Sequence, residues 1–164
     1  MSDADDRDRR QLRTVADYQF GAGAGAALFP TDERLRIDRT SSGRPSQVHA
    51  DSGRVVTYAV DGRFTLGVEG GLRLVERFDA PTYRVVVGDE SEPFVRDGKN
   101  AFAKFVRQVD TNVRPGDEVA VVDESDALLA VGRAELSGET MTDFETGMAV
   151  KVRSGAGAPG PTDE

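Results

Sequence analysis

The chain has 164 residues, 38% of them hydrophobic, and a formal net charge of -8. It has no cysteine and one histidine, which excludes a disulfide framework, a thiol nucleophile and a cysteine- or histidine-rich metal site. The acidic excess argues against a simple polybasic clamp for nucleic acid or anionic lipid, and no run approaches the ~20 apolar residues of a membrane-spanning helix.

The two ends of the chain are biased in composition. Residues 1–11 are rich in Asp and Arg and lack hydrophobic periodicity, which predicts a disordered arm and not a secretory signal peptide. Residues 155–164 are rich in Gly, Ala and Pro, which predicts a disordered tail. We therefore expect a cytoplasmic protein whose folded part lies between these ends.

Residues 12–80 predict a small α/β domain. Turn-forming residues separate four strand-like runs, at 35–39, 46–50, 54–60 and 64–68. Residues 72–78 fit either a helix or a strand, and the shared parity of Leu72, Leu74 and Phe78 favours a strand. The Gly/Ala-rich residues 20–28 match a loose dinucleotide-binding fingerprint, but Pro30 interrupts the helix that such a site requires, so we interpret them as a turn.

A predicted turn at Asp79-Ala80-Pro81 marks the expected boundary with a second domain, residues 81–154. Many short strands and two short helices are expected there, at spacings that favour a small mixed barrel over a parallel, doubly wound sheet. The helices are predicted at 92–97, ended by Gly98, and at 137–144, begun by Ser137. The fold class is therefore α+β.

Lysine is confined to two places in the sequence. Eighteen of the 21 basic residues are Arg, and the three lysines are Lys99, Lys104 and Lys151. Acid excess with scarce lysine is typical of halophilic proteins, although GC-rich coding gives the same Arg bias. Lys99 and Lys104 flank Phe102, and aromatic residues between basic ones are typical of surfaces that bind RNA. The alternative is that the phenylalanines belong to the core and the lysines are merely solvated.

Residues from about 83 to 154 resemble a PUA domain, an RNA-binding module. The ordered landmarks are Val85–Val87 with Glu90, Pro93-Phe94-Val95, Gly98–Val106 (GKNAFAKFV), Arg114–Val119 (RPGDEV), Leu129–Ala134 with Ser137-Gly138, and Gly147–Arg153. The resemblance is closest to the PUA domain of archaeal tRNA-guanine transglycosylases. Upstream, the segments 17–21, 39–44 and 61–70 resemble the small domain that precedes PUA in those enzymes, with an insertion in the second segment.

The resemblance implies a PUA-type β pseudo-barrel after the small domain, and an RNA groove beside the glycine that follows the first helix. Carried over residue by residue, it assigns RNA binding to Gly98, Lys99, Asn100, Phe102, Ala103, Lys104 and Phe105, together with Lys151 and Arg153 of the final strand. Gly98 would let a phosphate approach the backbone, and the lysines would supply charge-assisted hydrogen bonds.

The large catalytic barrel of the transglycosylase, which needs ~250 residues, is not contained in these 164 residues. We therefore expect a non-catalytic RNA-binding protein for tRNA, at its acceptor-stem end, that supports a modification such as archaeosine synthesis, with a tRNA-modifying enzyme as a possible partner. No cofactor, metal or small-molecule substrate is expected. The alternative is a protein-interaction adaptor that keeps the PUA fold but no longer binds RNA.

Overall fold

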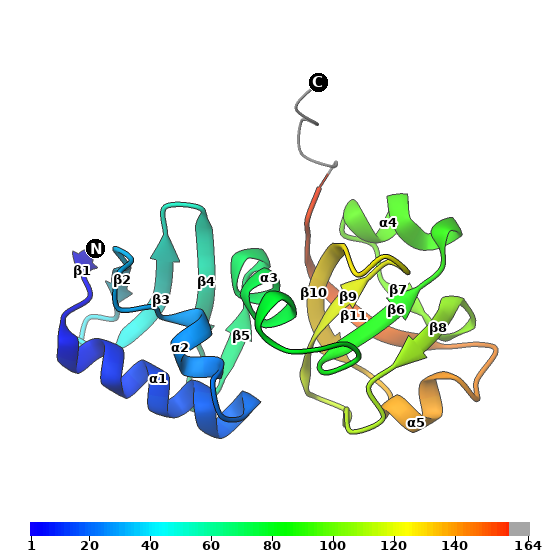
Figure 1. Cartoon of the computed structure of the whole chain (residues 1–164), viewed down its shortest axis with the longest axis horizontal. Helices are drawn as coiled ribbons and strands as arrows, with labels where there is room; N and C mark the ends of the chain where they lie inside the picture. The colour runs from blue at the N-terminus through cyan, green and yellow to red at the C-terminus, as the bar shows by residue number, and fades with distance from the viewer. Residues whose placement is uncertain (158–164) are drawn as a thin grey trace. The chain divides into compact units, whose positions relative to one another are not determined.

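The computed structural model describes residues 1–157, and its contacts divide the chain into two compact units, unit 1 up to Arg77 and unit 2 from Phe78 onward (Figure 1). Most of the predicted tail, residues 158–164, lies outside the described residues. Within residues 1–157, none of the helices is both long and apolar enough to cross a lipid bilayer. The fold class is α+β, as predicted.

Unit 1 contains a five-stranded antiparallel sheet in the order β1-β2-β3-β4-β5. The strands are β1 (Ser2–Asp3), β2 (Arg36–Arg39), β3 (Pro45–Ala50), β4 (Gly53–Tyr58) and β5 (Phe64–Leu66). The four strands predicted between residues 35 and 68 are therefore present, with ends that differ by one or a few residues, because each run is bounded by a turn that the sequence announces.

Three helices accompany this sheet: α1 (Asp6–Phe20), α2 (Ala24–Leu28) and α3 (Val68–Arg77) (Figure 1). Helix α1 buries Leu12, Ala16 and Phe20, which recur every four residues and form its inward stripe. The Gly/Ala-rich residues 20–28 contain both a turn and the short helix α2, and form no dinucleotide-binding unit.

The prediction of a disordered arm at residues 1–11 is wrong. Ser2–Asp3 pairs with β2, and α1 begins at Asp6. A capping box starts the helix, since the Asp8 N–H donates to Asp5 Oδ1 over 2.8 Å and the Asp5 N–H donates to Asp8 Oδ2 over 3.1 Å. The acidic residues that were interpreted as a sign of disorder satisfy the helix terminus instead.

The prediction of a strand at residues 72–78 is also wrong, because these residues lie in or next to α3. Leu74 is buried on the inward face of this helix, whereas Leu72 is 38% exposed. The helix approaches β4 closely at Gly70, where a Cβ atom would lie 2.1 Å from the Val55 carbonyl oxygen. The absence of a side chain at Gly70 is thus needed for the close packing of this helix on the sheet.

Unit 2 contains a six-stranded sheet in the order β7-β11-β10-β9-β6-β8, antiparallel except where β6 runs parallel to β9. Its strands are β6 (Arg84–Val87), β7 (Ala101–Phe102), β8 (Val106–Val109), β9 (Glu118–Val122), β10 (Leu128–Ala134) and β11 (Met148–Gly155). The curled sheet encloses a core made mainly of valine and alanine, with Leu129 and Met141 as its larger members.

Two short α-helices complete unit 2, α4 (Glu92–Arg96) and α5 (Gly138–Met141), as predicted, with 3-10 turns η1 (Asp89–Ser91) and η2 (Ala103–Phe105). Ser137 caps α5 by accepting from the Thr140 N–H over 3.2 Å.

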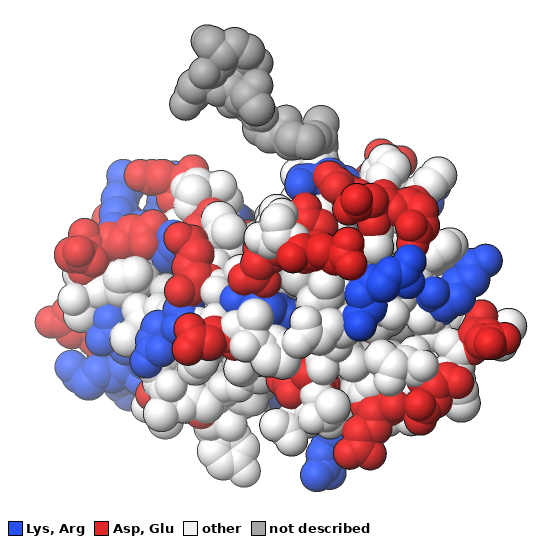
Figure 2. Space-filling model, turned by 45° about the vertical axis from the view of Figure 1, so that its right-hand side comes forward, with Lys and Arg blue, Asp and Glu red and all other residues white. Residues whose placement is uncertain are grey.

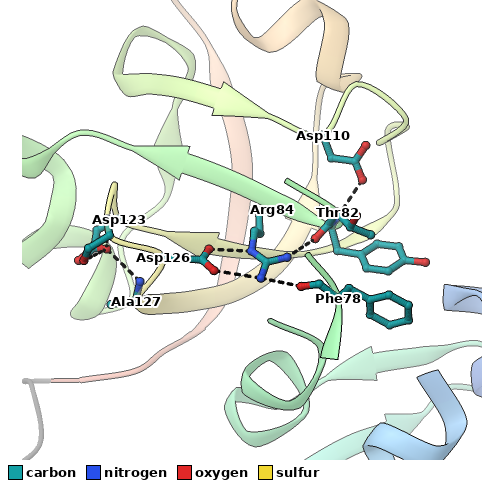
Figure 3. A network of polar contacts seen from close by, with 9 residues as sticks. Phe78, Thr82, Arg84, Asp110, Asp123, Asp126 and Ala127 are labelled. Atoms are coloured by element: carbon teal, nitrogen blue, oxygen red, sulfur yellow. Dashed lines mark hydrogen bonds and ion pairs between the residues drawn. The ribbon is translucent and has the colours of Figure 1, made fainter. Parts of the chain in front are cut away.

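A buried arginine fixes the start of unit 2 to its β9–β10 hairpin. The Arg84 guanidinium is 1% exposed and contacts Asp126 through two hydrogen bonds of 2.7 and 3.0 Å. It also donates to the carbonyl oxygens of Phe78 and Thr82, each over 2.9 Å, and Figure 3 shows these acceptors converging on it. The segment that opens unit 2 is therefore held within that unit.

Candidate nucleic-acid interface

A groove of about 490 Å³ opens on unit 2 beside the turn that joins α4 to β7. Its lining comes from η1, α4, the turn and the β7–η2 segment, and consists of Glu90, Ser91, Phe94, Val95, Lys99, Asn100, Phe102 and Phe105. We call this the Phe102 groove. Its volume lies in the range of pockets that bury an organic ligand.

The turn beside the groove depends on Gly98. Its φ of +94° is a left-handed conformation that favours glycine, and a Cβ atom there would find nothing within 4 Å. The Gly98 N–H donates to Val95 over 3.0 Å, and the Lys99 N–H donates to the Phe94 carbonyl over 2.9 Å. These bonds end α4 and direct the chain into β7, with an open surface at the glycine.

The aromatic rings of this segment are not core residues. Phe94 is 61% exposed and Phe102 is 43% exposed, while Phe105 is half-buried. The core positions of the segment are taken by Ala101 and Ala103 instead. The structure therefore decides against the alternative in which both Phe102 and Phe105 are enclosed, and it leaves aromatic surface available to a ligand.

Lys99 and Lys104 lie on either side of the Phe102 and Phe105 rings. Lys99 lines the Phe102 groove. Lys104 lines a second hollow of about 380 Å³ together with Phe102, Phe105 and residues 145–147. Its Nζ lies 4.9 Å from the centroid of the Phe105 ring, a cation–π contact that holds the ammonium over the aromatic surface.

Two of the predicted site residues have a structural role. The Asn100 Oδ1 accepts from the Val152 N–H over 2.9 Å and so ties β7 to β11. Ala103 is 3% exposed, and its N–H donates to the Gly147 carbonyl over 2.9 Å. Asn100 still lines the groove, whereas Ala103 belongs to the core beneath it.

The structure does not place Lys151 and Arg153 among the residues that line either hollow. Both lie on β11, and Lys151 is exposed opposite Arg133 of β10. Arg153 forms two hydrogen bonds with Glu118, one of them 3.0 Å between Nη1 and Oε2. Because Glu118 is 6% exposed, this pair compensates a buried carboxylate.

The groove also contains residues that were not predicted as site residues. Ser91 is 5% exposed, and its hydroxyl has no hydrogen-bond partner among the residues that the structure describes. Glu90 forms an ion pair of 2.5 Å with Arg107. The sequence drew attention to Glu90 and Phe94 only as landmarks of the family resemblance, and nothing in it singles out Ser91.

Charge is grouped in patches on the face of the molecule that Figure 2 shows. In Figure 2 the Lys and Arg side chains gather in separate patches between bands of Asp and Glu. In unit 1, the basic run at residues 34–44 is used by the fold, since Arg34 pairs with Asp3 over 3.1 Å and Arg39 with Asp8 over 2.9 Å.

The Asp8 carboxylate shows how the fold uses these charges. Its burial raises the pKa, but hydrogen bonds from the Asp5 backbone and from Arg39 outweigh burial and lower the pKa below its usual value.

No group of three or more His, Asp or Glu side chains within residues 1–157 is arranged to hold a metal ion.

Two family models match the chain. Residues 10–81 match the patch-forming domain C2 of tRNA-guanine transglycosylase, and residues 83–156 match the PUA domain. The resemblance seen in the sequence is thus confirmed for both parts of the chain.

The curated relatives are archaeal tRNA-guanine(15) transglycosylases. That of Methanothermobacter thermautotrophicus is 47% identical over 152 residues, covering 92% of this chain and 23% of the relative. That of Pyrococcus furiosus is 49% identical over 145 residues, covering 88% of this chain and 24% of the relative. The chain therefore spans about a quarter of the length of these relatives, and the match is to their C-terminal part without the catalytic domain.

Solved structures support the fold. A hypothetical protein of Pyrococcus horikoshii superposes with a TM-score of 0.72 at 21% identity, covering 94% of this chain and 93% of that one. A conserved PUA domain protein of Thermoplasma acidophilum gives a TM-score of 0.69 at 20% identity, covering 96% and 94%. The predicted PUA-type pseudo-barrel is confirmed.

Proposed function

Because the chain carries the C2 and PUA domains of the archaeal tRNA-guanine transglycosylases and corresponds to their non-catalytic C-terminal part, we propose that it is an RNA-binding protein that serves tRNA modification. Its ligand in this proposal is tRNA, bound at the acceptor-stem end, and archaeosine synthesis is the modification that the relatives favour. The observation that carries the proposal is the exposed Phe102 ring between two lysines at an open glycine turn.

The chemistry of the Phe102 groove fits unpaired RNA. Sequence-tolerant RNA recognition combines aromatic side chains, on which bases stack, with cations that contact phosphates. Phe94 and Phe102 offer exposed rings, and Lys99 and Lys104 offer ammonium groups on both sides of them. The bare surface at Gly98 allows a phosphate to approach the backbone.

Stacking carries more of the binding than charge if the protein works in concentrated salt. Charges are screened within ~3 Å at molar ionic strength, and counterion release contributes less there. Base stacking on an aromatic ring has no such dependence on salt. We therefore propose that shape, backbone donors and stacking provide most of the affinity, and that the lysines fix the position of the phosphates.

In the proposed role the chain supplies binding rather than chemistry. The curated relatives that this chain matches are about four times as long and are named tRNA-guanine(15) transglycosylases. We propose that this chain acts together with a tRNA-modifying catalytic unit, and that its C2 and PUA domains hold the tRNA for that unit.

The test is a binding measurement with unmodified tRNA in high salt, which compares wild type with Lys99→Glu/Lys104→Glu. Two lost charge-assisted contacts, short enough to escape screening by salt, and two added repulsions predict a loss of affinity of at least about tenfold. The matched control is Arg7→Glu/Arg114→Glu, which makes the same change in net charge at two exposed residues away from the groove and leaves affinity within about threefold.

Equal affinity in wild type and the lysine variant would refute the site. A wild type with no affinity for tRNA would refute the function and favour the adaptor, whose exposed Phe94 and Phe102 would contact a protein instead. Lys151→Glu adds a direct test of the final strand, because a loss as large as that of the groove variant would extend the interface to β11.

A further inference from the structure

A second groove, unrelated to the Phe102 groove, follows helix α1 in unit 1. It consists of two hollows of about 560 and 550 Å³ that share Thr14 and Val15. The first is lined by Asp8, Arg10, Gln11, Leu12, Thr14, Val15, Arg44, Pro45 and Tyr58, and the second by Thr14, Val15, Tyr18, Gln19, Asp61, Gly62 and Arg63. We call this the α1 groove.

The second hollow presents apolar side chains that the fold leaves uncovered. Tyr18, in its lining, and Val60, in the turn beside it, are each 94% exposed, more than any other large hydrophobic side chain within the described residues. Tyr18 stands on an ordered part of the helix, because the neighbouring Gln19 side chain bonds both the N–H and the carbonyl of Phe64, over 2.7 and 2.9 Å. An exposed tyrosine on a rigid element is typical of an interface anchor.

The first hollow offers a receptor for such a ring. The Arg44 guanidinium lies 4.9 Å from the centroid of the Tyr58 ring and donates to the Ala59 carbonyl, so its position is fixed. Arg10 lines the same hollow and is exposed. Aromatic rings and guanidinium groups attract each other when stacked, so this hollow suits a tyrosine that enters from outside.

The α1 groove is complementary to itself. Arg10 and Tyr18 lie four residues to either side of Thr14, on one continuous helix of 15 residues. A two-fold axis through Thr14 places the Tyr18 of one copy over the Arg10 of the other, and the reverse. It also brings Asp61 and Arg63, which line the Tyr18 hollow, towards the hollow of the other copy that Asp8, Arg10 and Arg44 line, so that Asp61 can meet Arg10. Self-complementarity of this kind is what a two-fold interface requires.

We propose that the α1 groove is the interface of a homodimer, in which two α1 helices pack antiparallel and each copy inserts Tyr18 into the Arg10–Arg44 hollow of the other. A helix of 15 residues is about 22 Å long, so the contact is at the small end of specific interfaces. The dimer therefore forms reversibly and its population depends on concentration. The interface involves unit 1 alone and does not rest on the proposed function of unit 2.

The experiment is sedimentation equilibrium of the full chain over a concentration series. Wild type dimerises, and Tyr18→Ala raises the dimer dissociation constant at least about tenfold. The control Phe144→Ala removes another exposed ring, 48% exposed and on unit 2, and leaves the dissociation constant unchanged. A circular-dichroism melt on each variant verifies that it is folded.

A charge swap tests the orientation of the helices. Arg10→Asp and Asp61→Arg each weaken the dimer by placing like charges together, and the double variant restores it, because the opposite charges meet again across the two-fold axis. A wild type that stays monomeric at all concentrations, or a dimer indifferent to Tyr18→Ala, overturns the proposal. So does a double variant no tighter than the single ones. The tRNA affinity per protomer is the same in all variants, so a failure here is distinct from a failure of RNA binding.

Discussion

The arginines and lysines of unit 2 differ in what they contact. Five of its six arginines form ion pairs with carboxylates, namely Arg84, Arg96, Arg107, Arg133 and Arg153. None of its three lysines forms an ion pair within the part of the chain that the structure describes. A planar guanidinium matches a carboxylate through two hydrogen bonds, whereas an ammonium is a mobile point charge. The fold of unit 2 thus uses arginine, and not lysine, for its own ion pairs.

Two regions show this difference most clearly. Around Arg84 the donors are matched by protein acceptors, from Asp126 and from two backbone carbonyls, and the side chain is 1% exposed (Figure 3). In the Phe102 groove, by contrast, the Ser91 hydroxyl has no hydrogen-bond partner and Lys99 forms no ion pair among residues 1–157. In the first region the hydrogen-bond donors of Arg84 have acceptors within the protein, whereas in the second a buried hydroxyl has no partner among the described residues. Substitutions in the first should therefore change stability, and those in the second should change binding.

The largest effect is expected for Arg84→Ala. The substitution removes at least four hydrogen bonds and a buried side chain, so the free energy of unfolding falls by about 2–4 kcal/mol. It falls by less than for a fully buried pair because Asp126 is 42% exposed and stays hydrated. Chemical denaturation measures the loss, and tRNA affinity is measured at a temperature where the variant is folded.

The control is Arg84→Lys, which keeps the charge but not the paired geometry, and is expected to lose less stability than the alanine variant. If Arg84→Ala were fully stable, or if it abolished tRNA binding while folded, it would be wrong to assign stability to the Arg84 region and binding to the Phe102 groove.

The second effect, on binding, is expected for Phe102→Ala. Removal of one stacking ring costs about 1–3 kcal/mol of RNA affinity, which is about 5- to 150-fold. The free energy of unfolding changes little because the ring is 43% exposed in the absence of ligand. The control Phe144→Ala removes an exposed ring that lines neither the Phe102 groove nor the hollow beside Lys104, and it leaves tRNA affinity unchanged. A loss of stability without a loss of affinity would assign Phe102 to the fold.

The sequence was most informative where a local rule and a tertiary role coincide. Gly98 after a short helix predicts a left-handed cap, and the structure has one with φ of +94°. The scarcity of lysine singled out Lys99 and Lys104, which lie beside exposed rings. In these cases the information lies in adjacent residues, so no knowledge of distant contacts is needed.

Elsewhere the outcome depended on residues far apart in the chain. Helix α3 packs closely on β4 because Gly70 leaves room for the Val55 carbonyl, a contact across 15 positions that no local pattern reveals. Arg153, which is predicted to contact RNA, forms a pair with Glu118, 35 residues away, and its sequence neighbours do not indicate this partner. That the Ser91 hydroxyl finds no hydrogen-bond partner in the described part of the chain depends on its surroundings in three dimensions, and its sequence neighbours do not indicate it.

The smallest effect concerns acid. Asp123, in the β9–β10 hairpin that also carries Asp126, accepts hydrogen bonds from Ser125 and Ala127 (Figure 3). Burial raises its pKa, but bonds from Ala127 and Ser125 and the charge of Arg96 outweigh burial and lower the pKa below its ordinary value of 3.8. A carboxylate whose pKa is lowered by folding stabilises the folded state at pH values above the ordinary pKa. This stabilisation is lost as the pH falls through the pKa of the folded state.

Asp123→Asn isolates the charge in this effect. All three hydrogen bonds end on Oδ1, an acceptor that asparagine retains, so the variant loses the negative charge and keeps the geometry. Wild type is therefore slightly more stable than the variant at neutral pH, and the difference shrinks below a pH of about 4. Denaturant titrations of both proteins at several pH values measure it. A difference in stability that persisted unchanged in acid would mean that the contribution of Asp123 to stability does not come from its charge.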